Sequence, residues 1–164
     1  MALEHFFVRH GHYGRVDLSF IGHEQAAQAA EELIHKNLGR NVLLMSSDAP
    51  RAAQTADVIS EALGTPYFAT ERLNIAGQTP EVVRDLDEFL HETATNRACD
   101  FDSETQFIVV AHAPLLAVIL GHAPLDYEMV EYGQIVPYEA GSWNDQYFDQ
   151  GEHDYYFPAS EGRL

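Results

Sequence analysis

The chain has 164 residues, of which 46% are hydrophobic, which suffices for one domain over 1–164 and excludes a chain that is disordered throughout. Its 26 acidic and 9 basic residues give a formal net charge of -17, which argues against nucleic acid or an anionic membrane as a partner. The N-terminus lacks a signal-peptide pattern, and the longest apolar stretch, residues 107–120, is too short to cross a bilayer. With Cys99 as the single cysteine, these features predict a soluble cytoplasmic protein.

The hydrophobic pattern predicts strands that alternate with helices along the chain. The expected strands cover residues 3–8, 42–45, 66–69 and 107–111, with late strands or a hairpin at 133–136 and 141–148. The expected helices cover residues 23–37, 49–63, 80–91 with Thr79 as the N-cap, and 114–120. This alternation favours an α/β fold with a mostly parallel sheet and helices on both faces, followed by about ten frayed C-terminal residues.

Three short segments are expected at one edge of this sheet, because ligands bind beyond the carboxyl ends of parallel strands. They are Arg9-His10-Gly11 after the first strand, residues 46–51 after the second, and His112 after the strand at 107–111. The sequence scatters these residues, and the expected topology gathers them.

The residue types at this edge suit phosphoryl transfer. An imidazole such as that of His10 can attack phosphorus and carry the phosphoryl group as phosphohistidine. Arg9 and Arg51 can fork onto the phosphoryl oxygens while staying charged. His112 can donate a further hydrogen bond, helped by backbone donors at the start of its helix. Gly11 allows the chain to turn sharply behind the nucleophile.

Two other interpretations of these and neighbouring residues remain open at this point. His10, His12 and His112 could ligate a metal ion, although two arginines in the same pocket would repel a cation, so no metal or other cofactor is expected. The repeated His-Ala-Pro-Leu at 122–125 follows a helix and is expected to be a structural loop. The aromatic and acidic segment 143–157 is expected to be an edge strand with a frayed tail, and an interaction patch is the alternative.

Four segments resemble, in order, the motifs of the histidine phosphatase superfamily, which includes the phosphoglycerate mutases. They are RHG at 9–11, LSFIGHEQA at 18–26, SSDAPRAAQTA at 46–56 and FIVVAH at 107–112. The resemblance implies a three-layer α/β/α domain of the phosphoglycerate mutase type and a metal-independent reaction. It also implies that His10 becomes phosphorylated, with Arg9, Arg51 and His112 around the phosphate.

The general acid is absent from the two positions where branches of the superfamily carry it. Ile75 stands at the mutase position, and Ala113 at the acid phosphatase position directly after the second histidine. Gly11 and Ala113 are expected to contact substrate through the backbone. Glu71 and His12 are the candidate proton donors that remain, although a solvated charge and a pocket-rim residue are their simpler interpretations.

The short length and the missing acid are similar to the SixA-type phosphohistidine phosphatases. A good leaving group needs less help from a general acid, so the expected substrates are a protein phosphohistidine and then small phosphomonoesters. The short connections predict an open pocket suited to a macromolecule. The alternative is a catalytically weak module of the same fold that binds phosphate or a phosphoprotein. The acidic surface is expected to aid solubility, with adaptation to high salt as an alternative.

Overall fold

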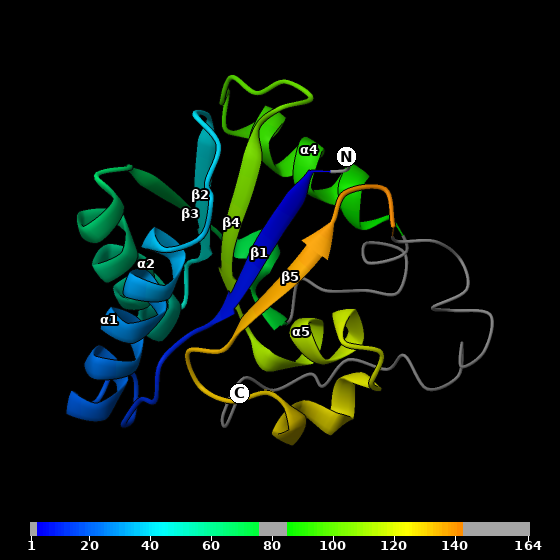
Figure 1. Ribbon diagram of the computed structural model, residues 1–164. Helices are drawn as coiled ribbons and strands as arrows, with labels where there is room; N and C mark the ends of the chain where they lie inside the picture. The colour runs from blue at the N-terminus through cyan, green and yellow to red at the C-terminus, as the bar shows by residue number, and fades with distance from the viewer. Residues whose placement is uncertain (1–2, 76–84, 143–164) are drawn as a thin grey trace.

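The computed structural model describes residues 3–75 and 85–142, and its centre is a five-stranded sheet (Figure 1). The strands are β1 (Glu4–Arg9), β2 (Val42–Ser47), β3 (Tyr67–Thr70), β4 (Gln106–Ala111) and β5 (Ile135–Glu139). Their spatial order is β3-β2-β4-β1-β5, with β1 to β4 parallel and β5 antiparallel to β1. The carboxyl ends of β1, β2, β3 and β4 therefore share one edge.

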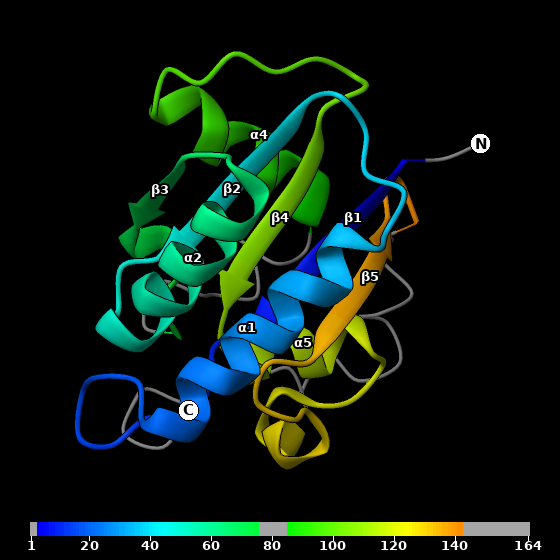
Figure 2. The same ribbon diagram turned by 60° about the vertical axis from the view of Figure 1, so that its left-hand side comes forward.

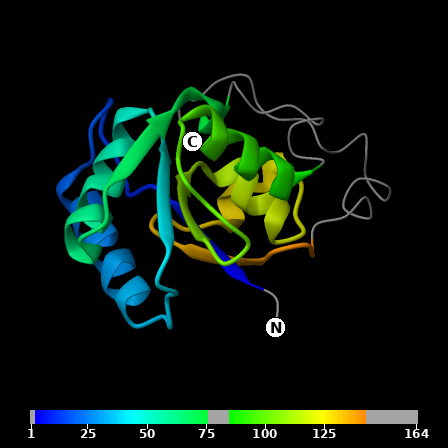
Figure 3. The same cartoon turned by 90° about the horizontal axis from the view of Figure 1, so that it is seen from above.

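Helices cover both faces of this sheet, as the views from the side and from above show (Figures 2 and 3). The α-helices are α1 (Phe20–Ile34), α2 (Pro50–Leu63), α4 (Leu86–Asn96) and α5 (Ala113–Ile119), and the short 3-10 helices are η1 (Glu71–Leu73) and η3 (Pro124–Met129). One layer holds α1 and α2, and the other holds α4 and α5. The predicted three-layer α/β/α fold is confirmed. Within the described ranges, no helix is both long and apolar enough to cross a membrane.

The central strand β4 shows why the layers assemble in this way. All six of its residues are buried, with Ile108 and Val110 facing the core under α1 and α2. Phe107 and Val109 face the opposite core under α4 and α5. Because successive side chains of a strand point to opposite faces, a strand covered on both sides reads as a continuous apolar run.

Two predicted helix boundaries are wrong, and capping explains one of them. The helix expected at 23–37 begins at Phe20, because the Ser19 side chain accepts a hydrogen bond from the Gly22 backbone N–H, and it ends at Ile34. The helix expected to end at 91 continues to Asn96, and Asp85 caps its described part by accepting from the Glu88 N–H. Residues 79–84, including the expected N-cap, lie outside the described residues.

The chain after α5 also differs from expectation. The second His-Ala-Pro-Leu segment runs into η3, which begins at Pro124 and was not predicted. The strand expected at 133–136 is β5, shifted to Ile135–Glu139. The described residues end at 142, so most of the strand expected at 141–148 and the segment 143–157 lie outside them.

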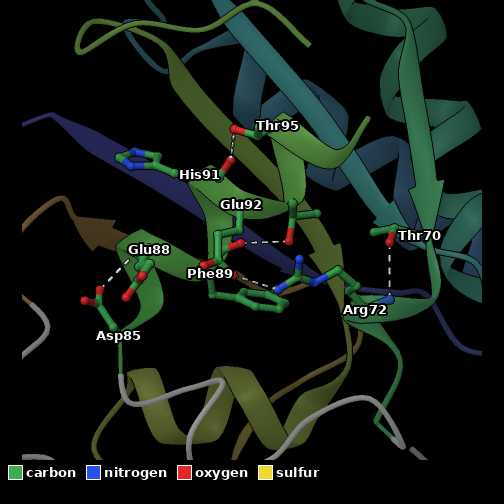
Figure 4. A network of polar contacts seen from close by, with 9 residues as sticks. Thr70, Arg72, Asp85, Glu88, Phe89, His91, Glu92 and Thr95 are labelled. Atoms are coloured by element: carbon green, nitrogen blue, oxygen red, sulfur yellow. Dashed lines mark hydrogen bonds and ion pairs between the residues drawn. The ribbon is translucent and has the colours of Figure 1, made fainter. Parts of the chain in front are cut away.

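A contact between η1 and α4 fixes the chain after β3 (Figure 4). The Arg72 guanidinium lies 5.0 Å from the Phe89 ring centroid, and its Nη2 atom is 3.4 Å from Oε2 of Glu92. The Thr70 side chain caps η1 by accepting from the Arg72 backbone N–H. These contacts join η1, which directly follows β3, to α4.

A buried histidine at the opposite end of β1 makes stability depend on pH. His5 is only 2% exposed, and its Nδ1 accepts a hydrogen bond of 2.9 Å from the Phe107 backbone N–H. Burial lowers the pKa of His5 to about 4, although Asp87 nearby acts in the opposite direction. Below about pH 6.5, the His5 imidazole of the unfolded chain begins to take up a proton. In the folded protein the same imidazole stays neutral until the pH approaches 4.

We expect the free energy of unfolding to fall as the pH drops from about 6.5 towards 4, by up to about 3 kcal/mol from His5 alone. The reason is that the unfolded state binds more protons in this window. A His5→Asn variant, whose amide oxygen can replace the Nδ1 acceptor, should show a flatter pH dependence in urea unfolding. His23→Asn, at an exposed position on α1, is the control and should keep the wild-type slope. An unchanged slope in His5→Asn would contradict this assignment.

Candidate active site at the carboxyl edge of the sheet

His10 directly follows β1 and is completely buried. Its Nδ1 lies 2.8 Å from the Gly11 carbonyl oxygen. A carbonyl can only accept a hydrogen bond, so Nδ1 must carry the proton and Nε2 of the neutral ring must hold the lone pair. The His10 backbone N–H donates to the Ala111 carbonyl at the end of β4, which ties the turn to the neighbouring strand.

Arg51, in the first turn of α2, joins two imidazoles at this edge. Its Nε donates to Nε2 of His10 at 3.3 Å, and its Nη2 lies 3.5 Å from Nδ1 of His112. The two histidine rings lie in contact, with centroids 5.2 Å apart. Because a guanidinium only donates, it faces a lone pair on each ring.

His112 follows β4 and is the N-cap residue of α5. Its Nε2 lies 2.8 Å from the Oγ atom of Ser47, the last residue of β2. The structure therefore brings together the ends of β1, β2 and β4, which are the three segments that the topology rule selected.

Arg9 ends β1 and is 5% exposed. Its Nη1 donates to the Val130 carbonyl at 2.5 Å, and its guanidinium carbon lies 3.9 Å from the Tyr132 ring centroid. Burial lowers the pKa of Arg9, while the nearby Tyr132 and Tyr13 act to raise it. Among the residues that the structure describes, its buried Nε finds no acceptor, so this cation retains an unused donor.

Two tyrosines that the sequence analysis did not select cover the site. The Tyr13 ring centroid lies 5.4 Å from that of His10 and 4.7 Å from the Arg51 guanidinium carbon. The Tyr132 ring lies 6.0 Å from that of His10 and packs on Arg9. The open pocket stays a prediction, and cation–π contacts place aromatic rings against the two arginines. A tyrosine just after the RHG motif is a usable signal for Tyr13, whereas Tyr132 comes from a distant loop.

A close crossing of two glycines holds the nucleophile loop against α1. A Cβ atom on Gly11 would collide with the Gly22 carbonyl, and one on Gly22 would collide with the His12 carbonyl. The Gly11 N–H donates to Thr55 Oγ1 at 3.0 Å, and that hydroxyl donates to the Arg51 carbonyl at 2.8 Å. The second and third sequence motifs thus place the loop and the arginine in one packed unit.

The candidate His12 lies at the rim of the site. Its side chain is exposed, its Nδ1 lies 2.7 Å from Ser19 Oγ, and its ring is 5.3 Å from that of Tyr132. Within residues 3–75 and 85–142, no group of three or more His, Cys, Asp or Glu side chains is arranged to hold a metal ion.

The two positions that carry the general acid elsewhere are apolar and buried here. Ile75 is 2% exposed just after η1, and Ala113 is fully buried as the first residue of α5. Glu71, the other candidate donor, is the exposed first residue of η1. Sequence reasoning missed Asn74, which follows η1 and hydrogen-bonds to Ser47.

Solved structures with this fold include phosphatases. The native structure of a mycobacterial glucosyl-3-phosphoglycerate phosphatase matches at a TM-score of 0.56 and 19% identity, over 84% of this chain and 90% of that one. A phosphoserine phosphatase from Entamoeba histolytica matches at a TM-score of 0.57 and 13% identity, over 99% and 100% of the two chains. The protein histidine phosphatase SixA, complexed with tungstate, matches at a TM-score of 0.51 and 20% identity, over 71% and 76%. At these identities the likeness establishes a shared fold.

One family model matches part of the sequence. Residues 6–75, which contain the RHG motif, the capped start of α1 and Arg51, match the model of the histidine phosphatase superfamily (branch 1). No curated protein matches the chain by sequence. The motifs and this family match therefore agree over residues 6–75, and the fold is shared with solved phosphatase structures.

The glycine crossing predicts an unusual response to alanine substitution. Gly22→Ala should lower the free energy of unfolding by about 2 kcal/mol, because the new Cβ overlaps the His12 carbonyl, although alanine favours a helix. Gly14→Ala is the matched control, since a Cβ there meets no atom within 4 Å. Urea unfolding of both variants tests this expectation, and equal stability of the two would contradict the crossing.

Proposed function

We propose that the protein is a metal-independent phosphatase in which Nε2 of His10 attacks phosphorus. The observation that carries this proposal is the hydrogen bond from Nδ1 of His10 to the Gly11 carbonyl. It leaves the lone pair on Nε2, the atom that faces Arg51. A neutral imidazole with its lone pair directed at a cation-lined site is prepared for nucleophilic attack on an anionic phosphoryl group.

In the first step, a bond forms between Nε2 of His10 and phosphorus while the bond from phosphorus to the leaving group breaks. The leaving group departs with the bonding electrons and takes up a proton. Arg51 contacts both imidazole lone pairs in the resting site, and we expect it to move its donors onto the phosphoryl oxygens. Arg9, with an unused Nε donor among the described residues, stabilises the same negative charge.

In the second step, water attacks phosphorus, the bond to Nε2 breaks, and inorganic phosphate leaves. The imidazole returns to its neutral form with its proton still on Nδ1, held by the Gly11 carbonyl. The chain's own arginines and histidines supply the charge stabilisation in both steps, so the reaction as proposed uses no cofactor.

The proposed substrate is a phosphohistidine on a protein, and small phosphomonoesters come second. The two family positions for a general acid hold the buried apolar side chains of Ile75 and Ala113. An alkoxide leaving group depends on such an acid, whereas an imidazole leaving group is far less basic. The similar fold of the protein histidine phosphatase SixA supports the same substrate class.

A phosphate-binding or phosphoprotein-binding module is the second candidate function. The complete burial of His10 beneath Tyr13 and Tyr132 favours it, because water must reach the phosphorylated ring for turnover. In this case the site would hold phosphate without forming a covalent intermediate.

The two candidates differ in turnover. We expect the wild type to release phosphate from a phosphohistidine protein faster than from p-nitrophenyl phosphate, and His10→Ala to lose on the order of 10³-fold or more in kcat. His23→Ala, at an exposed position on α1, is the control and should keep most activity. Full turnover in His10→Ala would contradict the proposed nucleophile. Phosphate binding without turnover by the wild type would establish the binding module.

A further inference from the structure

A chain of four polar side chains runs from the surface to His112. The Asn74 Nδ2 donates to Oδ1 of Asp48 at 2.5 Å, and Ser47 Oγ donates to Oδ1 of Asn74. Ser47 Oγ also lies 2.8 Å from Nε2 of His112. Asp48 is exposed, Asn74 is half-buried, and Ser47 and His112 are buried, so the chain connects a solvated carboxylate to a buried imidazole.

The carboxylate determines how the whole chain is oriented. Asp48 accepts hydrogen bonds only, so it selects the amide orientation in which Nδ2 of Asn74 faces it and Oδ1 faces Ser47. The Ser47 hydroxyl must then donate to that oxygen. Its lone pairs are left to accept from the Ala49 N–H, at 3.2 Å, and from Nε2–H of His112.

This orientation fixes the tautomer of His112, and it is the opposite tautomer to the one that His10 adopts. His112 carries its proton on Nε2 and presents the Nδ1 lone pair to Arg51, whereas His10 carries its proton on Nδ1. The Nδ1 lone pair of His112 would repel an incoming phosphoryl oxygen. To hydrogen-bond that oxygen, His112 must become an imidazolium with N–H groups at both positions.

We propose that Asp48 and Asn74 are positioning residues that act through Ser47 to orient His112 and to stabilise its imidazolium form when a phosphoryl group binds. The negative charge of Asp48 polarises the amide and the hydroxyl in the sense that favours positive charge on the ring. This proposal rests on the proposed phosphatase function, and it gives the site a proton-bearing group although Ile75 and Ala113 occupy the familiar acid positions.

Other groups around His112 act on its charge in both directions. Arg51 from α2 disfavours the imidazolium in the resting site, and the neighbouring ring of His10 follows β1. The phosphoryl dianion reverses this balance when it engages Arg51. Asp48, at the end of β2, supplies negative charge through the chain both with and without substrate.

The tautomer can be measured in the resting protein without any turnover. Two-bond ¹H–¹⁵N NMR spectra should show His112 protonated at Nε2 in the wild type and in Asp57→Asn, a control that removes an exposed charge hydrogen-bonded to Tyr67. In Asn74→Leu, the preference for Nε2–H should be lost. Nδ1–H of His112 in the wild type would overturn the proposal, whatever the activity of the protein proves to be.

The pH profile tests the role of the charge. Asp48→Asn retains an acceptor for Asn74 and removes only the charge, so its kcat/KM should match the wild type at acidic pH and fall below it by about tenfold at pH 8. KM should change less than kcat. Asp57→Asn should follow the wild-type profile, and unfolding curves should show that all variants fold. If Asp48→Asn and Asp57→Asn have the same profile, Asp48 has no such role.

The outcomes separate this proposal from the proposed function. An Nε2–H tautomer that depends on Asn74, in a protein without phosphatase turnover, would leave the orientation of His112 standing and reject the catalytic function. If turnover depends on His10 but the His112 tautomer does not respond to Asn74→Leu, the catalytic function stands and the proposed orientation of His112 is rejected.

Discussion

The Gly11 carbonyl oxygen decides what the site can do, because it fixes the proton of His10 on Nδ1 and leaves Nε2 as a base. Gly11 itself is held in place by its close crossing over Gly22 and by the hydrogen bond from its backbone N–H to the Thr55 hydroxyl. The turn after β1, the start of α1 and the first turns of α2 therefore form one unit whose geometry sets the chemistry of a single nitrogen. The rest of the fold serves to hold these three elements at one edge of the sheet.

The charge at this edge of the sheet is positive, whereas the net charge of the whole molecule is negative. The chain carries a formal charge of -17, yet two arginines are buried side by side at the site. Among the described contacts, Arg9 donates to the Val130 carbonyl and packs on Tyr132, and Arg51 contacts two imidazole rings and Tyr13. An entering phosphoryl dianion would meet both cations in a site of low dielectric.

The sequence predicted the layers, the order of the main elements and the grouping of His10, Arg51 and His112, because each depends on local signals. A buried strand followed by a polar motif can be read directly from residues 3–11 and 107–112. The contact of Tyr132 with the site could not be predicted, since Tyr132 reaches it from the loop before β5. Asp48, although it lies within the motif at 46–56, and Asn74, which lies in no motif, were missed because their roles depend on the orientation of one amide. The start of α1 moved because a side-chain cap at Ser19, and not hydrophobic periodicity, sets that helix end.

The most direct test of this account is to trap the enzyme with a ³²P-labelled or phosphohistidine substrate under alkaline quench and to locate the phosphate by peptide mapping and ³¹P NMR. The account predicts one phosphoryl group on His10, bonded to Nε2, because the Gly11 carbonyl holds the other ring nitrogen as a donor. Phosphate on Nδ1 of His10, on His112 or on Ser47 would contradict it.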